Sequence, residues 1–385
     1  MDSSNTAIWK NPRPSSTRFC RPIRVQWLHE TDEVSKAEEA YLNQQIDQLK
    51  PYESKIGQIN FSMHLTMVDG KVCNALSNSS AMCCYICGAT PKEMNFILSL
   101  RSRSVNTAKF RFGLSVLHAH IRFFECLLHI AYRLDVKTWK VSKTIKPLVN
   151  ERKKKLQDAF REKMGLLVDI PKPGFGTSND GNTARRFFKN PKLSAEISGI
   201  DENLIRRFGV ILKAMSAGLP INVKTFEVYC LDTAETYVKL YNWYYMPASV
   251  HKILIHGPAV IQNFMVPIGQ LSEEAAESKN KEFKFFWEYF TRKSSRENTN
   301  ADLFNRLLLS SDPLLSTISY KNLPKENKSQ IDPEINNLLL IEENQAEDRA
   351  QQEGEDDDDD CDYEEEEEEE EQEEEDNDND ERNVK

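Results

Sequence analysis

The sequence has no long hydrophobic run. None of its apolar stretches approaches the length of about 18 residues that a membrane-spanning helix needs. Its first residues, MDSSNTAIWKNPRPSS, lack the apolar segment of a secretory signal. We find no internal repeat either. These absences predict an intracellular protein without a membrane partner.

The cysteines do not show the pattern of a disulfide-bonded protein. Eight cysteines in 385 residues of an intracellular chain argue against a disulfide framework. Only Cys83, Cys84 and Cys87 cluster. Four others lie in apolar or mixed segments, which favours buried core thiols. These four are Cys20, Cys73, Cys126 and Cys230.

Charge is divided unequally along the chain. Residues 341–385 hold 27 Asp and Glu against 3 Lys and Arg, a net charge of −24. Residues 1–340 therefore hold 34 acidic and 47 basic residues, a net charge of +13. A basic body favours binding of a polyanion such as double-stranded DNA through phosphate contacts. The alternative is a solvated surface with a solubilising tail. The acidic segment is too polar to bury a core, so we expect disorder there.

Hydrophobic periodicity predicts a mostly helical chain with a few strands. We expect strands at residues 20–28 and 58–68, the second ending at Asp69, and a Gly/Pro/Asn-rich loop at residues 171–182. The expected helices are 33–49, 114–134, 149–163, 183–188, 204–215, 224–243, 249–255 and 274–291.

Cys84 and Cys87 form a CxxC pair that is followed by a glycine. This spacing lets two thiolates bind one tetrahedral Zn²⁺, and His251 and His256 of VHKILIHG can supply the other two ligands. Histidines five apart do not share a face of an α-helix, but they converge if the helix ends between them. The alternative is a pair of buried thiols.

Two carboxylates, Asp69 and Glu277, form a second candidate site. Asp69 follows an expected strand, and Glu277 lies near the start of an expected helix. Converging carboxylates are the ligands that Mg²⁺ or Mn²⁺ needs for phosphoryl transfer. The alternative for Glu277 is a simple interaction with the positive end of the helix.

Basic residues mark two candidate DNA contacts. Asn182, Arg185 and Arg186 of GNTARR open an expected helix after a flexible loop, where backbone N–H groups and guanidinium groups can bind phosphate. Arg292 and Lys293 belong to the run TRKSSR. The alternative for the first group is an ordinary capped helix start.

Together, several segments resemble the Transib DNA transposases and their relative, the catalytic subunit of the V(D)J recombinase. The resemblance covers roughly residues 20–290. The segments that carry it are CRPIRVQWLHETDE, MVDGKVCNAL, CCYICGAT, LHAHIRFFE, ERKKKLQDAFREKMGL, GNTARRFF, SVHKILIHG and PIGQLSEEAAESKNK.

The resemblance implies an RNase H-like core whose Asp-Asp-Glu triad holds two Mg²⁺ or Mn²⁺ ions, split by a helical, zinc-bearing insertion. Asp69 matches the second triad member, and Glu277 matches the third. His118 matches a histidine near the active site. Arg185 and Arg186 match a basic pair near the DNA end. The resemblance assigns the zinc ligands to Cys84, Cys87, His251 and His256. It also implies a nuclear protein that acts as a homodimer.

The predicted fold is therefore an α-rich α+β fold with a partial, split RNase H-like core, a large helical zinc-binding insertion and a disordered acidic C-terminal tail. The expected parts are an extended arm (1–18), the RNase H-like portion carrying Asp69 (19–82), the insertion (83–266), the portion carrying Glu277 (267–323) and the tail (324–385).

The chain departs from this family at the first triad position. In the family that Asp lies well upstream of the CRPIR-like segment, whereas only about twenty residues precede Cys20 here and Asp2 is their sole acid. We expect impaired catalysis, because one metal ion loses its anchoring ligand. Three functions remain open: a transposase-derived DNA-binding protein, an active metal-dependent endonuclease or strand transferase, and an acidic-tailed protein that binds chromatin or histones.

Overall fold

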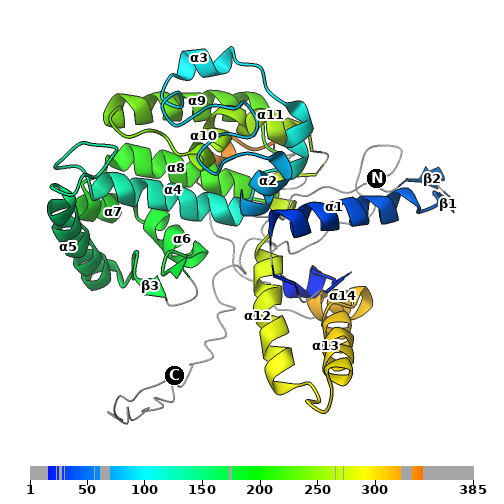
Figure 1. The fold of residues 1–385 in the computed structure, drawn as a ribbon. Helices are drawn as coiled ribbons and strands as arrows, with labels where there is room; N and C mark the ends of the chain where they lie inside the picture. The colour runs from blue at the N-terminus through cyan, green and yellow to red at the C-terminus, as the bar shows by residue number, and fades with distance from the viewer. Residues whose placement is uncertain are drawn as a thin grey trace, which may run out of the picture.

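The computed structural model describes residues 16–22, 24–25, 28–29, 31–55, 57–60, 70–172, 176–264, 266–271, 273–321 and 332–340. These residues are mostly helical (Figure 1). Their only sheets are two antiparallel hairpins. The first pairs β1 (Tyr52–Ser54) with β2 (Gly57–Ile59), and the second pairs β3 (Pro171–Lys172) with β4 (Gly176–Thr177). The predicted α-rich character is confirmed.

A helical body surrounds the buried helix α4 (Val116–Ala131), which packs against α8 (Glu202–Ser216). The helix begins where the Ser115 hydroxyl accepts a hydrogen bond from the backbone N–H of His118, 3.2 Å away. Helix α4 carries apolar residues on most of its faces, so neighbouring helices cover it on several sides. Figure 1 shows α4, α8 and α9 (Val223–Tyr241) stacked in the body.

Seven of the eight expected helices occur within a few residues of their predicted bounds, whereas the helix expected at 249–255 continues to Gln262. Around the body lie α5 (Lys146–Met164), α6 (Gly181–Lys189), α7 (Pro191–Ser198), α10 (Ala248–His251), η3 (Lys252–His256), α11 (Gly257–Gln262) and η4 (Ile268–Leu271). Earlier in the chain are η1 (Thr17–Phe19), α1 (Asp32–Asp47), α2 (Gly70–Ser77), α3 (Ile97–Arg101) and η2 (Thr107–Phe112).

A smaller group of helices projects from the body (Figure 1). It contains α12 (Glu274–Tyr289), α13 (Arg296–Ser310) and α14 (Pro313–Lys321). The short helix η1 packs against α12 and α14, so the N-terminal segment completes this group. The expected helix 274–291 corresponds to α12.

The strand expected at residues 20–28 is wrong for the residues described there, none of which belongs to a strand. Arg21 instead donates hydrogen bonds to the carbonyl oxygens of Leu308 (3.1 Å) and Ser311 (3.2 Å) at the end of α13. Pro22 has no backbone N–H to contribute to a ladder. Side-chain contacts with α13 therefore replace strand pairing in this segment.

The strand expected at residues 58–68 is described only at its start, where β2 ends at Ile59. Residues 61–69 lie outside the described residues, and Asp69 is among them. The predicted Asp69–Glu277 pair and the extended arm before residue 16 therefore stay predictions.

Disorder from residue 324 onward is wrong for residues 332–340. The short helix α15 (Pro333–Asn336) buries Ile335, and Leu338 and Leu339 are buried after it. The backbone N–H of Asn222 donates to the carbonyl of Leu338 at 2.8 Å, and Leu339 forms a β-bridge with Ile221. A short apolar cluster can thus dock although its neighbours are polar. Disorder of residues 341–385 stays a prediction, because they lie outside the described residues.

Within the part of the chain that the structure describes, every helix is too short or too polar to cross a membrane.

Candidate metal centre

Cys84 and Cys87 lie on a tight buried turn after α2. The backbone N–H of Gly88 donates to the carbonyl of Cys84 at 2.7 Å, and the N–H of Cys84 donates to the carbonyl of Ala89 at 3.0 Å. Gly88 has φ +69°, a conformation that glycine adopts without strain. The turn therefore holds both sulfur atoms on one side, as a CxxC metal site requires.

His251 and His256 lie at the two ends of one helical turn. His251 is the last residue of α10, and His256 is the last residue of η3, which has π-helical geometry. Hydrogen bonds in a π-helix join residues five apart, so residues with that spacing lie almost above one another. The prediction that the helix ends between the histidines is wrong: it widens there and continues as α11.

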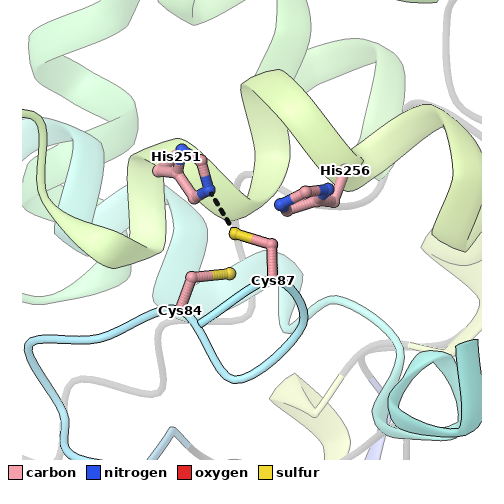
Figure 2. A group of neighbouring side chains, drawn as sticks. All are labelled: Cys84, Cys87, His251 and His256. Atoms are coloured by element: carbon pink, nitrogen blue, oxygen red, sulfur yellow. Dashed lines mark hydrogen bonds between the residues drawn. The ribbon is translucent and has the colours of Figure 1, made fainter. Parts of the chain in front are cut away.

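The four side chains converge in one buried cluster (Figure 2). Their ligand atoms all lie within 4.8 Å of one another, and Sγ of Cys87 is 3.4 Å from Nε2 of His251. Neighbouring sulfur and nitrogen ligands of a tetrahedral zinc ion are about 3.5 Å apart, from bond lengths of about 2.3 and 2.0 Å. The Cys87–His251 distance matches this spacing, and every other pair of ligand atoms is at most 4.8 Å apart.

Protonation at Cys87 and His251 suits a metal. The Cys84 thiol donates a hydrogen bond to Cys87, and this bond lowers the pKa of Cys87 and raises that of Cys84. Burial lowers the pKa of His251, so its ring is neutral near pH 7. Thiolate and neutral imidazole are the forms that bind zinc, so metal binding would also displace the proton of the Cys84 thiol.

One buried ring atom tests whether the cluster fits a metal. Nε2 of His256 has no hydrogen-bond partner among the described residues, although its surroundings exclude water. A buried nitrogen without a partner is costly, and a metal ion satisfies it. The buried group of Cys84, Cys87, His251 and His256 can therefore bind a metal such as zinc. Bound zinc would fix the turn after α2 to the α10–η3 helix.

Two further residues, Lys252 and Tyr85, lie beside the cluster, and no sequence pattern indicated them. Nζ of Lys252 lies 4.4 Å from the centre of the Tyr85 ring, in a cation–π contact. Each is a sequence neighbour of a predicted ligand, one beside His251 and the other beside Cys84. Their contact therefore joins the same two segments as the metal ligands do.

A second buried cluster joins the start of α4 to the start of α12. Oε1 of Glu273 accepts hydrogen bonds from the backbone N–H of His118 at 3.1 Å and from the Ser115 hydroxyl, and it lies 3.2 Å from Nδ1 of His118. Glu273 is only 3% exposed, and its Oε2 has no hydrogen-bond partner among the described residues. The structure therefore brings His118 to a carboxylate that the sequence analysis missed.

Glu277 lies one turn beyond Glu273 and is exposed to solvent. Its backbone N–H donates to the carbonyl of Glu273 at 3.1 Å, as in an ordinary helix start. Glu274, the residue after Glu273, forms an ion pair with Arg185 of α6. His118 and Arg185, which the resemblance implies, thus contact Glu273 and Glu274 at the start of α12. Both therefore lie beside the turn that carries Glu277.

The other predicted DNA contacts have partners inside the chain. Arg186 donates a hydrogen bond of 2.6 Å to the carbonyl of Met164 at the end of α5. Nη1 of Arg185 lies 3.3 Å from Oδ1 of Asn182. Arg292 pairs with Asp302 at 2.8 Å, and Nζ of Lys293 lies 4.1 Å from the centre of the Trp287 ring. Arg186, Arg292 and Lys293 therefore stabilise local structure, whatever else they contact.

The Glu273 carboxylate gives a pH-dependent prediction. Burial alone raises its pKa, but hydrogen bonds from His118 and Ser115 outweigh burial and lower the pKa. Its stabilising effect is therefore present above the ordinary pKa of Glu and is lost as the pH falls through the lowered value. Glu273→Gln should lower the free energy of unfolding by about 1–2 kcal/mol near pH 7, with a smaller difference near pH 3. Urea unfolding at both pH values measures this.

Glu277→Gln is the matched control, because Glu277 is exposed one turn away. We expect it to leave stability unchanged at both pH values. An effect of Glu273→Gln that is the same at acid and neutral pH would contradict the role of the Glu273 charge.

Comparison of the chain with models of known protein families and with curated proteins finds no match.

Proposed function

We propose that this chain is a DNA-binding protein derived from a transposase or recombinase, with impaired strand-transfer chemistry. The convergence of Cys84, Cys87, His251 and His256 carries the proposal. Cys87 and His251 are 164 positions apart, yet they meet at 3.4 Å in the combination that the resemblance assigns to one zinc clip. In this proposal the clip pins a helical insertion to a split RNase H-like core.

The start of α12 supports the proposed position of the active site. The contact of Glu273 with His118 and the ion pair of Glu274 with Arg185 bring two residues implied by the resemblance to the helix that carries Glu277. Glu277 is exposed in the first turn, where a divalent cation and a DNA phosphate have access to it. In this proposal Glu277 and Asp69 bind Mg²⁺ or Mn²⁺, and Arg185 neutralises phosphate charge.

Charge supports a nucleic-acid partner. Residues 1–340 carry a net charge of +13, which favours double-stranded DNA and a nuclear location. Because only two triad carboxylates match within these 385 residues, we expect strand transfer by this chain to be weak. A homodimer on DNA, and an acidic tail that contacts histones or other basic proteins, belong to the same proposal.

Duplex binding and plasmid nicking test the proposal with full-length protein. We expect binding to a random duplex whose affinity falls steeply with salt, with a log–log slope of about −0.9 per neutralised phosphate. We expect little nicking of supercoiled plasmid in Mg²⁺ or Mn²⁺. Binding that is absent at low salt, or that does not depend on salt, contradicts the proposal.

Two other outcomes would favour the alternative functions. Robust nicking that is lost in Asp69→Ala and in Glu277→Ala establishes the enzyme. Binding to histones without binding to DNA establishes the chromatin-binding protein. Glu282→Ala is a matched control for Glu277→Ala, because it also removes a carboxylate from helix α12. The Glu282 carboxylate pairs with Lys279 and is not a proposed metal ligand.

A further inference from the structure

One side of helix α14, in the smaller helical group, is apolar and exposed (Figure 1). Leu314 is 69% exposed, Leu315 is 46% exposed and Ile318 is 50% exposed. Ile318 follows the two leucines by four and three positions, so all three side chains lie on the same side of the helix. We call these three residues the α14 face. Single exposed apolar residues are ordinary, whereas a group of them on one side of a helix indicates an interaction surface.

The opposite side of α14 packs against the first described residues of the chain. Ser316 is buried, and its hydroxyl donates a hydrogen bond of 2.9 Å to the carbonyl of Arg18 in η1. Ser316 is two positions from Leu314 and from Ile318, so it lies about 160° around the helix from each. The chain that precedes η1 therefore arrives at α14 on the side away from the α14 face.

Residues 1–15 precede the described part of the chain and supply a segment that can cover the α14 face. Apart from Met1, their bulky apolar side chains are Ile8 and Trp9, which lie in an otherwise polar stretch. Ser16 follows Trp9 by seven positions, a span of up to about 23 Å at about 3.3 Å per residue. A helix with its side chains is about 10–12 Å wide. The arm is therefore long enough to pass around α14.

The chain already shows this kind of docking at residues 332–340. There Ile335, Leu338 and Leu339 are buried against the body, although the surrounding sequence is polar. A tethered segment also has an advantage over a partner from solution, because its docking is intramolecular and its effective concentration is high. The position of η1 against α14 therefore favours the arm over a second copy of the chain as the occupant.

We propose that Ile8 and Trp9 pack on the α14 face, so that α14 lies between η1 and the N-terminal arm. An indole ring suits this position, because it buries a large apolar area while its N–H can stay in contact with water. The docked arm carries Lys10 and Arg13 to the smaller helical group and shields the α14 face from a second copy. This inference goes beyond the proposed DNA-binding function and does not depend on it.

Tryptophan fluorescence of the full-length protein tests the proposal. The signal of Trp9 is the difference between the spectra of the unsubstituted protein and of Trp9→Phe. We expect emission at short wavelength and protection from quenching by acrylamide. Measured in the same way, a chain with both Leu314→Ser and Ile318→Ser should show this signal at longer wavelength and without protection. Leu98→Ser is the matched control, since Leu98 is 79% exposed on α3, and it should leave the Trp9 signal unchanged.

Helix content by circular dichroism should be unchanged in the double variant, because both substituted side chains are exposed. Leu315→Ser is a milder second variant, and it should cause a smaller shift in the same direction. A Trp9 signal typical of water-exposed indole in the unsubstituted protein would overturn the proposal. Protection that survives the substitutions on the α14 face would also overturn it.

Sedimentation measurements at several protein concentrations separate the arm from a second copy. We expect protection of Trp9 that does not change on dilution, because the contact lies within one chain. Protection that disappears as a dimer dissociates would show that the contact is made between two copies and would contradict docking within one chain.

Discussion

His251→Ala should abolish stoichiometric zinc binding and lower the free energy of unfolding by about 3–5 kcal/mol. The substitution removes one of four buried ligands and leaves the Cys87 thiolate without its histidine partner at 3.4 Å. It also releases the α10–η3 helix from the turn after α2. Metal analysis of the purified protein and urea unfolding measure the two effects.

Cys83→Ser is the matched control for this experiment. Cys83 is the neighbour of Cys84 in the sequence but does not belong to the cluster of potential ligands. We expect full zinc content and nearly unchanged stability. If His251→Ala protein keeps its zinc, or if unsubstituted protein contains none, the four side chains are not a zinc site.

Ending the chain after Leu340 should raise the affinity for duplex DNA by about tenfold or more at low salt. This truncation removes residues 341–385, which carry a net charge of −24, and leaves a chain with a net charge of +13. In the proposed function, the acidic segment is expected to compete with DNA for the basic body and to repel the phosphates, so its loss should favour binding. Fluorescence anisotropy with a labelled duplex at several salt concentrations measures the gain, which should shrink as salt rises.

Ending the chain after Lys321 is the informative comparison, because it also removes residues 332–340. Ile335, Leu338 and Leu339 are then lost from the core, at a cost of about 5 kcal/mol from their buried apolar area. A single-residue pair refines the comparison: Leu338 is 3% exposed, whereas Leu340 is 51% exposed. Leu338→Ala should destabilise the protein much more than Leu340→Ala. Equal stability of the two truncated chains would contradict docking of residues 332–340.

Helix positions could be predicted from the sequence because apolar spacing reports directly which helix face is buried. The long apolar helix became α4, and the charged helix became α5. The docked segment 332–340 could not be predicted in this way. Its three buried residues lie within a long polar stretch, and their partners near Ile221 are more than a hundred positions away.

The candidate sites were predictable to different degrees. Ligand type and spacing indicated Cys84, Cys87, His251 and His256 as candidate metal ligands, and the structure brings them together. Glu273 was missed because EEAAE offers three carboxylates within one turn and a half, and only the tertiary contact with His118 distinguishes it from Glu277. Spacing in the sequence cannot show which of several glutamates at the start of a helix will contact a neighbouring helix.

The widened turn between His251 and His256 has a consequence for recognising such sites in sequences. Histidine pairs that share a metal on an ordinary α-helix are three or four positions apart, as in HxxxH. A π-helical turn accommodates one more residue, so its ligand pair is written HxxxxH. Deleting one residue from Lys252–Ile255 would restore the α-helical repeat while shortening the spacing to HxxxH. Searches restricted to the shorter spacing would pass over the candidate pair His251 and His256.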